Sequence, residues 1–131
     1  MPTRALILLG HGARDAQWAL PLREVQARIR VAHPAFRVEL AFLDFIAPDL
    51  PTRVAELAAE GMAHIAILPM FIATGGHLKR DLPEKVAVLQ ARYPQLHLEL
   101  AEAIGMAESV QDAMAREAAR YLASRCGRTP G

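Results

Sequence analysis

The sequence predicts an α/β fold, a three-layer sandwich built on a four-stranded, mostly parallel sheet. Four short apolar runs alternate with four amphipathic stretches, and two of those runs are almost continuously hydrophobic. Continuous apolar runs are typical of parallel strands buried on both faces. Strands that alternate with helices form βαβ units, whose right-handed crossovers place helices on both faces of the sheet.

The apolar runs define the predicted strands. Segments 4–10 and 64–71 are the nearly continuous ones, whereas segments 36–45 and 96–101 alternate apolar and polar residues. Alternation indicates a strand with one solvated face, so the second pair is expected nearer the edges of the sheet.

The amphipathic stretches supply the helices. Apolar residues recur there at the spacing of one helical face, in the sets Trp18, Leu22, Val25 and Ile29, then Leu50, Val54 and Leu57, then Leu82, Val86 and Leu89, and last Val110, Met114, Ala118 and Tyr121. Pro21 fits the first turns of the first helix, and Gly61 ends the second. Asp81, with Glu84 three residues later, is expected to cap the third helix.

Length and composition limit the class of protein. The 131 residues predict one domain, 1–125, followed by a flexible tail, 126–131. A net charge of +1 argues against a nucleic-acid or membrane-surface partner. The longest apolar stretch, 65–73, is about half of what a membrane-spanning helix needs. Because the chain has a single cysteine, Cys126, a cytoplasmic location is expected.

Three residues suited to binding metals or moving protons are predicted at one edge of the sheet. Ligands of open α/β sheets bind at the carboxyl ends of the strands. His11 follows the first predicted strand, Asp44 the second, and His77 lies in the loop after the third. Glycines flank His11 and precede His77, which favours the close approach of a ligand. Asp44 serves equally well as a cap of the second helix.

Motifs that are absent narrow the chemistry. The chain has no G-x-x-x-x-G-K-[ST] phosphate loop, no G-x-G-x-x-G and no G-x-S-x-G, so ATP, dinucleotide and serine-hydrolase chemistry are not indicated. Two histidines and a carboxylate with open coordination positions suit a metal ion in transit. Cations near the same edge are candidates to bind substrate carboxylates or phosphates, namely Arg14, Lys79 and Arg80.

Three segments carry a family resemblance. LILLGHGARD, VELAFLDFIAPDLP and ILPMFIATGGHLKRDLP resemble the sirohydrochlorin chelatases, class II tetrapyrrole chelatases that insert cobalt, iron or nickel without ATP. The resemblance implies a chelatase-like half-domain that inserts Co²⁺ or Fe²⁺, or else Ni²⁺, into a sirohydrochlorin-like tetrapyrrole in cobalamin or siroheme biosynthesis. It implies no permanently bound cofactor. Family members of this length pair as homodimers, so a homodimer is expected.

The resemblance also implies roles for single residues. It makes His11 a metal ligand and proton acceptor and His77 the second metal ligand. Asp44 and Ala47 stand where the family often has two glutamates, and Asp44 keeps the charge while Ala47 has no ligating group. Besides Ala47, the residues implied to line the macrocycle are those of the loop before His77: Ile72, Ala73, Thr74, Gly75 and Gly76.

Two other functions stay open on the sequence alone. A non-catalytic metal or tetrapyrrole carrier is compatible with the missing glutamates and would bind without turnover. A phosphoryl-transfer enzyme with a histidine nucleophile also places a His-Gly pair at a strand end. Such an enzyme needs an arginine directly before the histidine, where this chain has Gly10.

Overall fold

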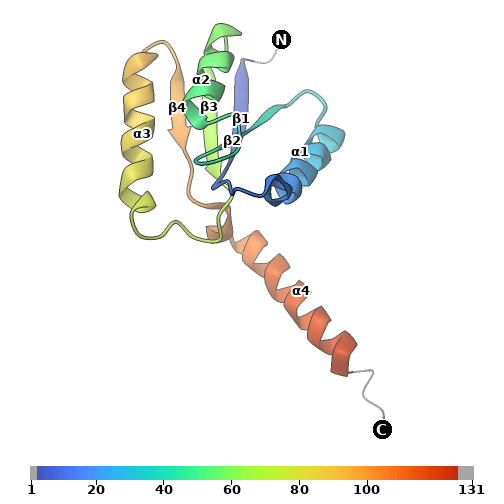
Figure 1. Ribbon diagram of the computed structural model, residues 1–131. Coiled ribbons are helices and arrows are strands. Elements are labelled where there is room, and N and C mark those ends of the chain that lie inside the picture. Colours follow the sequence, from blue (N-terminus) through green and yellow to red (C-terminus); the bar gives the residue numbers. More distant parts are fainter. Residues whose placement is uncertain (1–2, 127–131) are drawn as a thin grey trace.

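The predicted order of strands and helices is confirmed by the computed structural model, which describes residues 3–126 (Figure 1). Two short 3₁₀ helices, η1 and η2, accompany the regular elements. In chain order these are β1 (Arg4–Gly10), η1 (Ala16–Ala19), α1 (Leu20–Ala32), β2 (Arg37–Phe42), α2 (Leu50–Ala59), β3 (His64–Pro69), α3 (Leu78–Arg92), β4 (His97–Leu100), η2 (Ile104–Met106) and α4 (Glu108–Cys126).

The four strands form one parallel sheet in the order β2-β1-β3-β4. As the continuous apolar runs predict, β1 and β3 are the central strands. Ile7 and Leu9 of β1 and Ile67 of β3 are fully buried. The edge strand β4 alternates, with Leu98 buried between the exposed His97 and Glu99.

Helices cover the two faces of the sheet unequally. On one face, α2 and α3 pack against β1, β3 and β4 through a large apolar cluster that includes Val54, Leu57 and Val86. On the other face, α1 packs mainly against β1 and β2 through Leu22, Val25 and Ile29. The sheet layer and its helices form the expected three-layer α/β sandwich.

Two helix starts differ from the sequence predictions. Asp49, not Asp44, caps α2, because its carboxylate accepts a hydrogen bond of 2.8 Å from the backbone N–H of Thr52. The prediction that Asp81 caps α3 is wrong, since this helix begins at Leu78 and Asp81 lies in its first turn. There the acidic side chain favourably opposes the positive end of the helix dipole.

Replacing the Asp49 cap is expected to destabilise the fold in a pH-dependent way. Hydrogen bonds from the side chain and backbone of Thr52 hold the pKa of Asp49 below its ordinary value of 3.8. The stabilisation is therefore fully present above pH 3.8 and is lost as the pH falls through the lowered pKa. Asp49→Ala should lower the free energy of unfolding by about 1 kcal/mol at pH 7.

Urea unfolding of the wild type and this variant at pH 7 and at progressively lower pH measures the difference. Asp44→Ala is the matched control, because Asp44 is exposed and does not cap α2. A difference between the wild type and Asp49→Ala that stays constant down to acid pH would contradict this account of the cap.

The last helix departs from the predicted packing. The sequence places all helices on the faces of the sheet, but α4 projects away from the rest of the molecule (Figure 1). From Glu108 to Arg125 every side chain is exposed or half-exposed. The helix continues to Cys126, the first residue of the predicted tail, and the remaining tail, 127–131, lies outside the described residues. Over residues 3–126, no helix is long and apolar enough to cross a membrane.

Candidate active site

The loops after β1 and β2 are joined at the carboxyl edge of the sheet, as the strand-end argument predicts. Leu43 donates a backbone hydrogen bond of 3.0 Å to the carbonyl of Gly10, and Asp44 donates one of 2.9 Å to the carbonyl of His11. A side chain at Gly12, whose φ is +87°, would collide with the backbone carbonyl oxygen of Asp44. Glycine at this position therefore lets the His11 loop lie directly on the Asp44 loop.

The His11 ring lies on a hydrophobic base. It stacks on Phe71, with a distance of 4.2 Å between ring centroids and an interplanar angle of 27°. Phe71 is buried, whereas His11 is exposed. Packing on one ring face limits the orientations of the imidazole and leaves its edge accessible, which suits a side chain that binds a metal or accepts a proton.

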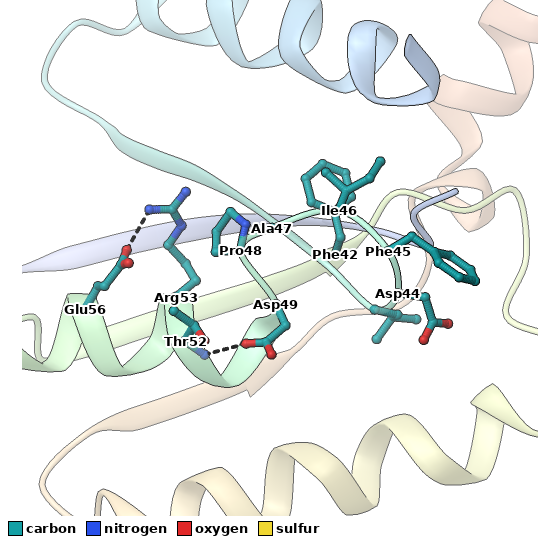
Figure 2. A pocket seen from close by; sticks show the side chains of 11 residues that line it. Phe42, Asp44, Phe45, Ile46, Ala47, Pro48, Asp49, Thr52, Arg53 and Glu56 are labelled. Atoms are coloured by element: carbon teal, nitrogen blue, oxygen red, sulfur yellow. Dashed lines mark hydrogen bonds and ion pairs between the residues drawn. The ribbon is translucent and has the colours of Figure 1, made fainter. Parts of the chain in front are cut away.

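Asp44 lies in a tightly coiled loop between β2 and α2. Phe45 has a φ of +66°, and the Ala47–Pro48 peptide bond is cis. The loop and the first turns of α2 line a hollow of about 710 Å³. In Figure 2, the Asp44 carboxylate and the Phe45 ring lie at one end of this hollow, and the ion pair of Arg53 and Glu56 lies at the other. Both Asp44 and Ala47 are exposed.

Large apolar side chains are exposed among the loops at this edge. Phe45 is 68% exposed and Ile72 is 72% exposed. The guanidinium of Arg14 sits over the Phe45 ring at 5.0 Å, which places a cation beside an aromatic face. Apolar side chains beside cations are suited to bind a ligand that is hydrophobic over its faces and acidic at its periphery.

The second predicted histidine precedes α3. His77 is exposed, and its carbonyl accepts hydrogen bonds from the backbone N–H groups of Arg80 and Asp81, at 3.1 and 2.8 Å. Ala73 and Thr74 line a hollow of about 550 Å³ that Lys79 also borders. Arg80, Gly75 and Gly76 are exposed and do not line that hollow.

The three candidate ligands share one edge of the sheet but do not form a ready metal site. Within residues 3–126, no three His, Cys, Asp or Glu side chains are grouped so that they could hold a metal ion. The assignment of His11, Asp44 and His77 to metal and proton chemistry therefore stays a prediction. Any ion held here would take some of its ligands from solvent or from a bound substrate.

Sequence reasoning missed three residues that shape the edge. Phe71 supports His11, and Phe45 forms the aromatic face beneath Arg14. Gly105 packs so closely on the backbone of Ile72 that a Cβ there would collide with it, which ties η2 to the loop after β3. The sequence feature that points to Gly105 is a glycine that directly follows the fourth strand. The stacking of a ring such as Phe71 on a distant residue produces no local sequence pattern.

Comparison with known proteins decides the family. The CbiX family model matches residues 5–121, nearly the whole of the described chain. The chain belongs to the CbiX family. A crystal structure of a CbiX protein from Marinobacter aquaeolei VT8 superposes on this CbiX chain with a TM-score of 0.78 at 26% sequence identity, covering 91% of this chain and 97% of that one.

Two curated relatives of this CbiX chain are longer than the chain itself. The sirohydrochlorin ferrochelatase of Bacillus subtilis is 30% identical over 115 residues, which are 85% of this chain and 42% of the relative. The sirohydrochlorin cobaltochelatase of Methanococcus aeolicus is 34% identical over 86 residues, 66% of this chain and 60% of the relative. The CbiX chain thus spans about half the length of these two curated relatives.

One relative has been solved with metal. The structure of SirB from Bacillus subtilis with Fe³⁺ matches this CbiX chain with a TM-score of 0.72 at 27% identity, covering 88% of this chain and 46% of SirB. A SirB structure in complex with cobalt, from Bacillus subtilis subspecies spizizenii, gives a TM-score of 0.69 at 29% identity. The match covers 88% of this chain and 49% of that one.

Proposed function

We propose that this CbiX chain inserts Co²⁺ or Fe²⁺ into sirohydrochlorin without using ATP. The observation that carries the proposal is the accessible His11 imidazole, held on Phe71 among exposed apolar side chains at the carboxyl edge of the sheet. The names of the relatives, sirohydrochlorin ferrochelatase and cobaltochelatase, support the same reaction.

The reaction sets two requirements for the protein. Two pyrrole N–H protons must leave the macrocycle, and the incoming ion must exchange solvent ligands for pyrrole nitrogens. A neutral imidazole nitrogen is able to bind an ion or to accept a proton. It does not do both at once.

The side chains divide these tasks in the proposed mechanism. His11 and His77 hold the ion beside one face of the macrocycle, and the remaining coordination positions are left to water and then to the pyrrole nitrogens. As those nitrogens displace the histidines, His11 accepts one pyrrole proton and solvent water accepts the other. Asp44 orients an imidazole or passes the proton to water. The metal is a substrate in this scheme, and no cofactor is bound permanently.

The rest of the edge is proposed to bind the macrocycle. Phe45 and Ile72 present apolar surface that matches the faces of a tetrapyrrole, together with Ala47 and the loop 73–76. Arg14, Lys79 and Arg80 supply positive charge for its peripheral carboxylates. We also propose that the chain acts in the cytoplasm as a homodimer, without a nucleic-acid or membrane partner.

A spectroscopic assay tests the proposed function. Purified protein is mixed with sirohydrochlorin and Co²⁺, Fe²⁺ or Ni²⁺, and the initial rate of the absorption change is compared with the rate without protein. Acceleration by Co²⁺ or Fe²⁺ that is unaffected by ATP is expected. Rates equal to the protein-free rates with all three metals would contradict the proposal.

The role of Asp44 gives a separate prediction. Asp44→Asn keeps the size of the side chain but removes its charge, so proton transfer through His11 should slow. We expect the insertion rate to fall by about 10-fold to 100-fold, at or below the lower limit of what one acid–base group contributes, because His11 itself is retained. Asp49→Asn is the control, because the side chain of Asp49 caps α2. Equal rates for Asp44→Asn and the wild type would remove Asp44 from the mechanism.

Two observations favour the alternative function of a metal or tetrapyrrole carrier. The described residues form no preassembled site with three metal ligands, and Ala47 contributes no ligating group. A carrier would bind metal or tetrapyrrole in a fixed ratio and would not release a metallated product. Product formed in excess of the protein separates the two functions.

A further inference from the structure

Two histidines lie side by side at the amino end of the sheet, away from the candidate active site. His64 begins β3 and His97 begins β4, and the two are direct partners in the register of the parallel pair. Their side chains therefore project from the same face of the sheet. The ring centroids lie 5.3 Å apart, with an interplanar angle of 62°. The proposed mechanism gives neither side chain a role.

This pairing differs from the other histidine ring contacts in the molecule. Two further histidines each stack on a phenylalanine, namely His11 on Phe71 and His33 on Phe36. Those imidazoles lie against an apolar ring, whereas His64 and His97 present two imidazoles to each other. Neutral imidazole is the commonest metal ligand in proteins, and it suits Zn²⁺, Ni²⁺ and similar late transition-metal ions. The pair is therefore a donor set for such an ion.

The spacing of the two rings fits two ligands of one metal ion. Imidazole nitrogens bind Zn²⁺ at about 2.0–2.1 Å, so two such rings on a tetrahedral ion have centroids roughly 5 Å apart. The 5.3 Å between the centroids of His64 and His97 matches that separation. Directing one nitrogen of each ring at a shared ion therefore requires rotation of the side chains and no movement of the strands.

Backbone hydrogen bonds fix the positions from which the two side chains project. The N–H of His64 donates to the carbonyl of Thr3 at 3.1 Å, and the N–H of His97 donates to the carbonyl of Ala63 at 2.8 Å. Ala63 also donates to the carbonyl of Thr3, at 2.8 Å, so the chain is tied together across the sheet beside the pair. Ligands that project from a rigid backbone lose less freedom when they converge on an ion.

The surroundings of the pair leave room for an ion and its water ligands. His64 and His97 are exposed, and they border a hollow of about 300 Å³ whose lining carries one charge of each sign, Arg4 and Glu99. Arg4 opposes the binding of a cation, and Glu99 favours it. Within residues 3–126 no third His, Cys, Asp or Glu joins the pair closely enough to hold a metal ion. Water therefore takes the remaining coordination positions.

We propose that His64 and His97 form a second metal site, which binds one divalent late transition-metal ion such as Zn²⁺ through their two imidazoles. The site is separate from the place of metal insertion. His64 pairs with Arg4 at the start of β1, and the strand from Arg4 to Gly10, just before His11, spans about 20 Å. An ion at the pair joins the amino ends of β3 and the short edge strand β4. The proposal goes beyond metal insertion and does not depend on it.

Calorimetry tests the second site in protein that lacks the proposed ligands of the first. The His11→Ala, His77→Ala double variant is titrated with Zn²⁺, and binding of one equivalent per chain is expected. Adding His64→Gln or His97→Gln should weaken this binding by about 10-fold or more, since even the partners of metal ligands contribute that much. Adding His33→Gln is the matched control and should leave it unchanged. No binding of Zn²⁺, or binding that neither glutamine substitution weakens, would overturn the proposal.

Paramagnetic Co²⁺ locates the ion without relying on substitutions at the pair. Co²⁺ is added to the same ¹⁵N-labelled double variant, and the amide signals are followed by NMR. Signals of residues 64–66 and 97–99 should broaden at lower Co²⁺ concentration than signals of residues 11–14 and 44–47 at the carboxyl edge. Uniform broadening, broadening that begins elsewhere, or no broadening at these strand starts would overturn the proposal.

The second metal site and the proposed function fail separately. If Zn²⁺ binds through His64 and His97 while the absorption assay shows no metal insertion, the proposed function is wrong and the second site stands. If the wild type inserts metal while the His11→Ala, His77→Ala variant binds no Zn²⁺, the second site is wrong and the function stands.

Discussion

His11→Ala and His77→Ala are each expected to reduce the initial rate of metal insertion by about 100-fold or more, because each removes a metal ligand and the first also removes the proton acceptor. The double variant should be scarcely slower than either single one. The two histidines act on the same ion, and residues that act as a unit are not additive.

The structure offers a matched control for this experiment. His33 at the end of α1 is also an exposed histidine stacked on a phenylalanine, Phe36, at 4.5 Å between ring centroids. His33 follows α1 and so lies away from the carboxyl edge of the sheet, where His11 lies. His33→Ala therefore removes the same kind of histidine–phenylalanine stacking outside the candidate site. We expect this variant to insert metal at the wild-type rate. Wild-type rates for both His11→Ala and His77→Ala would refute the proposed mechanism.

Gly12→Ala is expected to have the second-largest effect, through the geometry of the site. At a φ of +87° an alanine is strained by roughly 1–2 kcal/mol. In addition, its Cβ would collide with the carbonyl oxygen of Asp44. The His11 loop and the Asp44 loop must therefore separate, which displaces the imidazole from Phe71. Insertion should slow by about 10-fold or more, since a shift of this kind removes catalytic alignment.

Gly61→Ala separates the strain from the collision. Gly61 has nearly the same backbone conformation, with a φ of +86°, but a Cβ there meets no atom within 4 Å. Both variants should lose thermal stability, and only Gly12→Ala should lose activity once both are assayed well below their melting temperatures. Equal activity of Gly12→Ala and Gly61→Ala would show that the contact between the His11 loop and the Asp44 loop does not contribute to metal insertion.

The sequence was sufficient to predict the architecture because the strongest signals are local. The apolar runs of β1 and β3 and the spacing of Leu82, Val86 and Leu89 in α3 each reflect burial of one element. The position of His11 at the carboxyl edge follows from the parallel sheet. These parts of the fold can be predicted without knowing which distant segments of the chain contact each other.

Contacts between distant segments could not be predicted in the same way. The stacking of His11 on Phe71 joins residues that are far apart in the chain, and no periodicity records it. Asp49 rather than Asp44 caps α2 because the coiled loop delays the start of the helix, which the sequence pattern does not show. Amphipathicity predicted α4, but it does not show that this helix projects away from its own sheet.

The central claim is that this CbiX chain catalyses metal insertion rather than only binding metal or tetrapyrrole. The most direct test uses protein at a small fraction of the sirohydrochlorin concentration, with excess Co²⁺ and no ATP, and follows the absorption of the metallated product to completion. Many equivalents of product per chain are expected, formed faster than in the absence of protein. A yield that stops at one equivalent per chain or less, with no increase over the protein-free rate, would contradict the central claim.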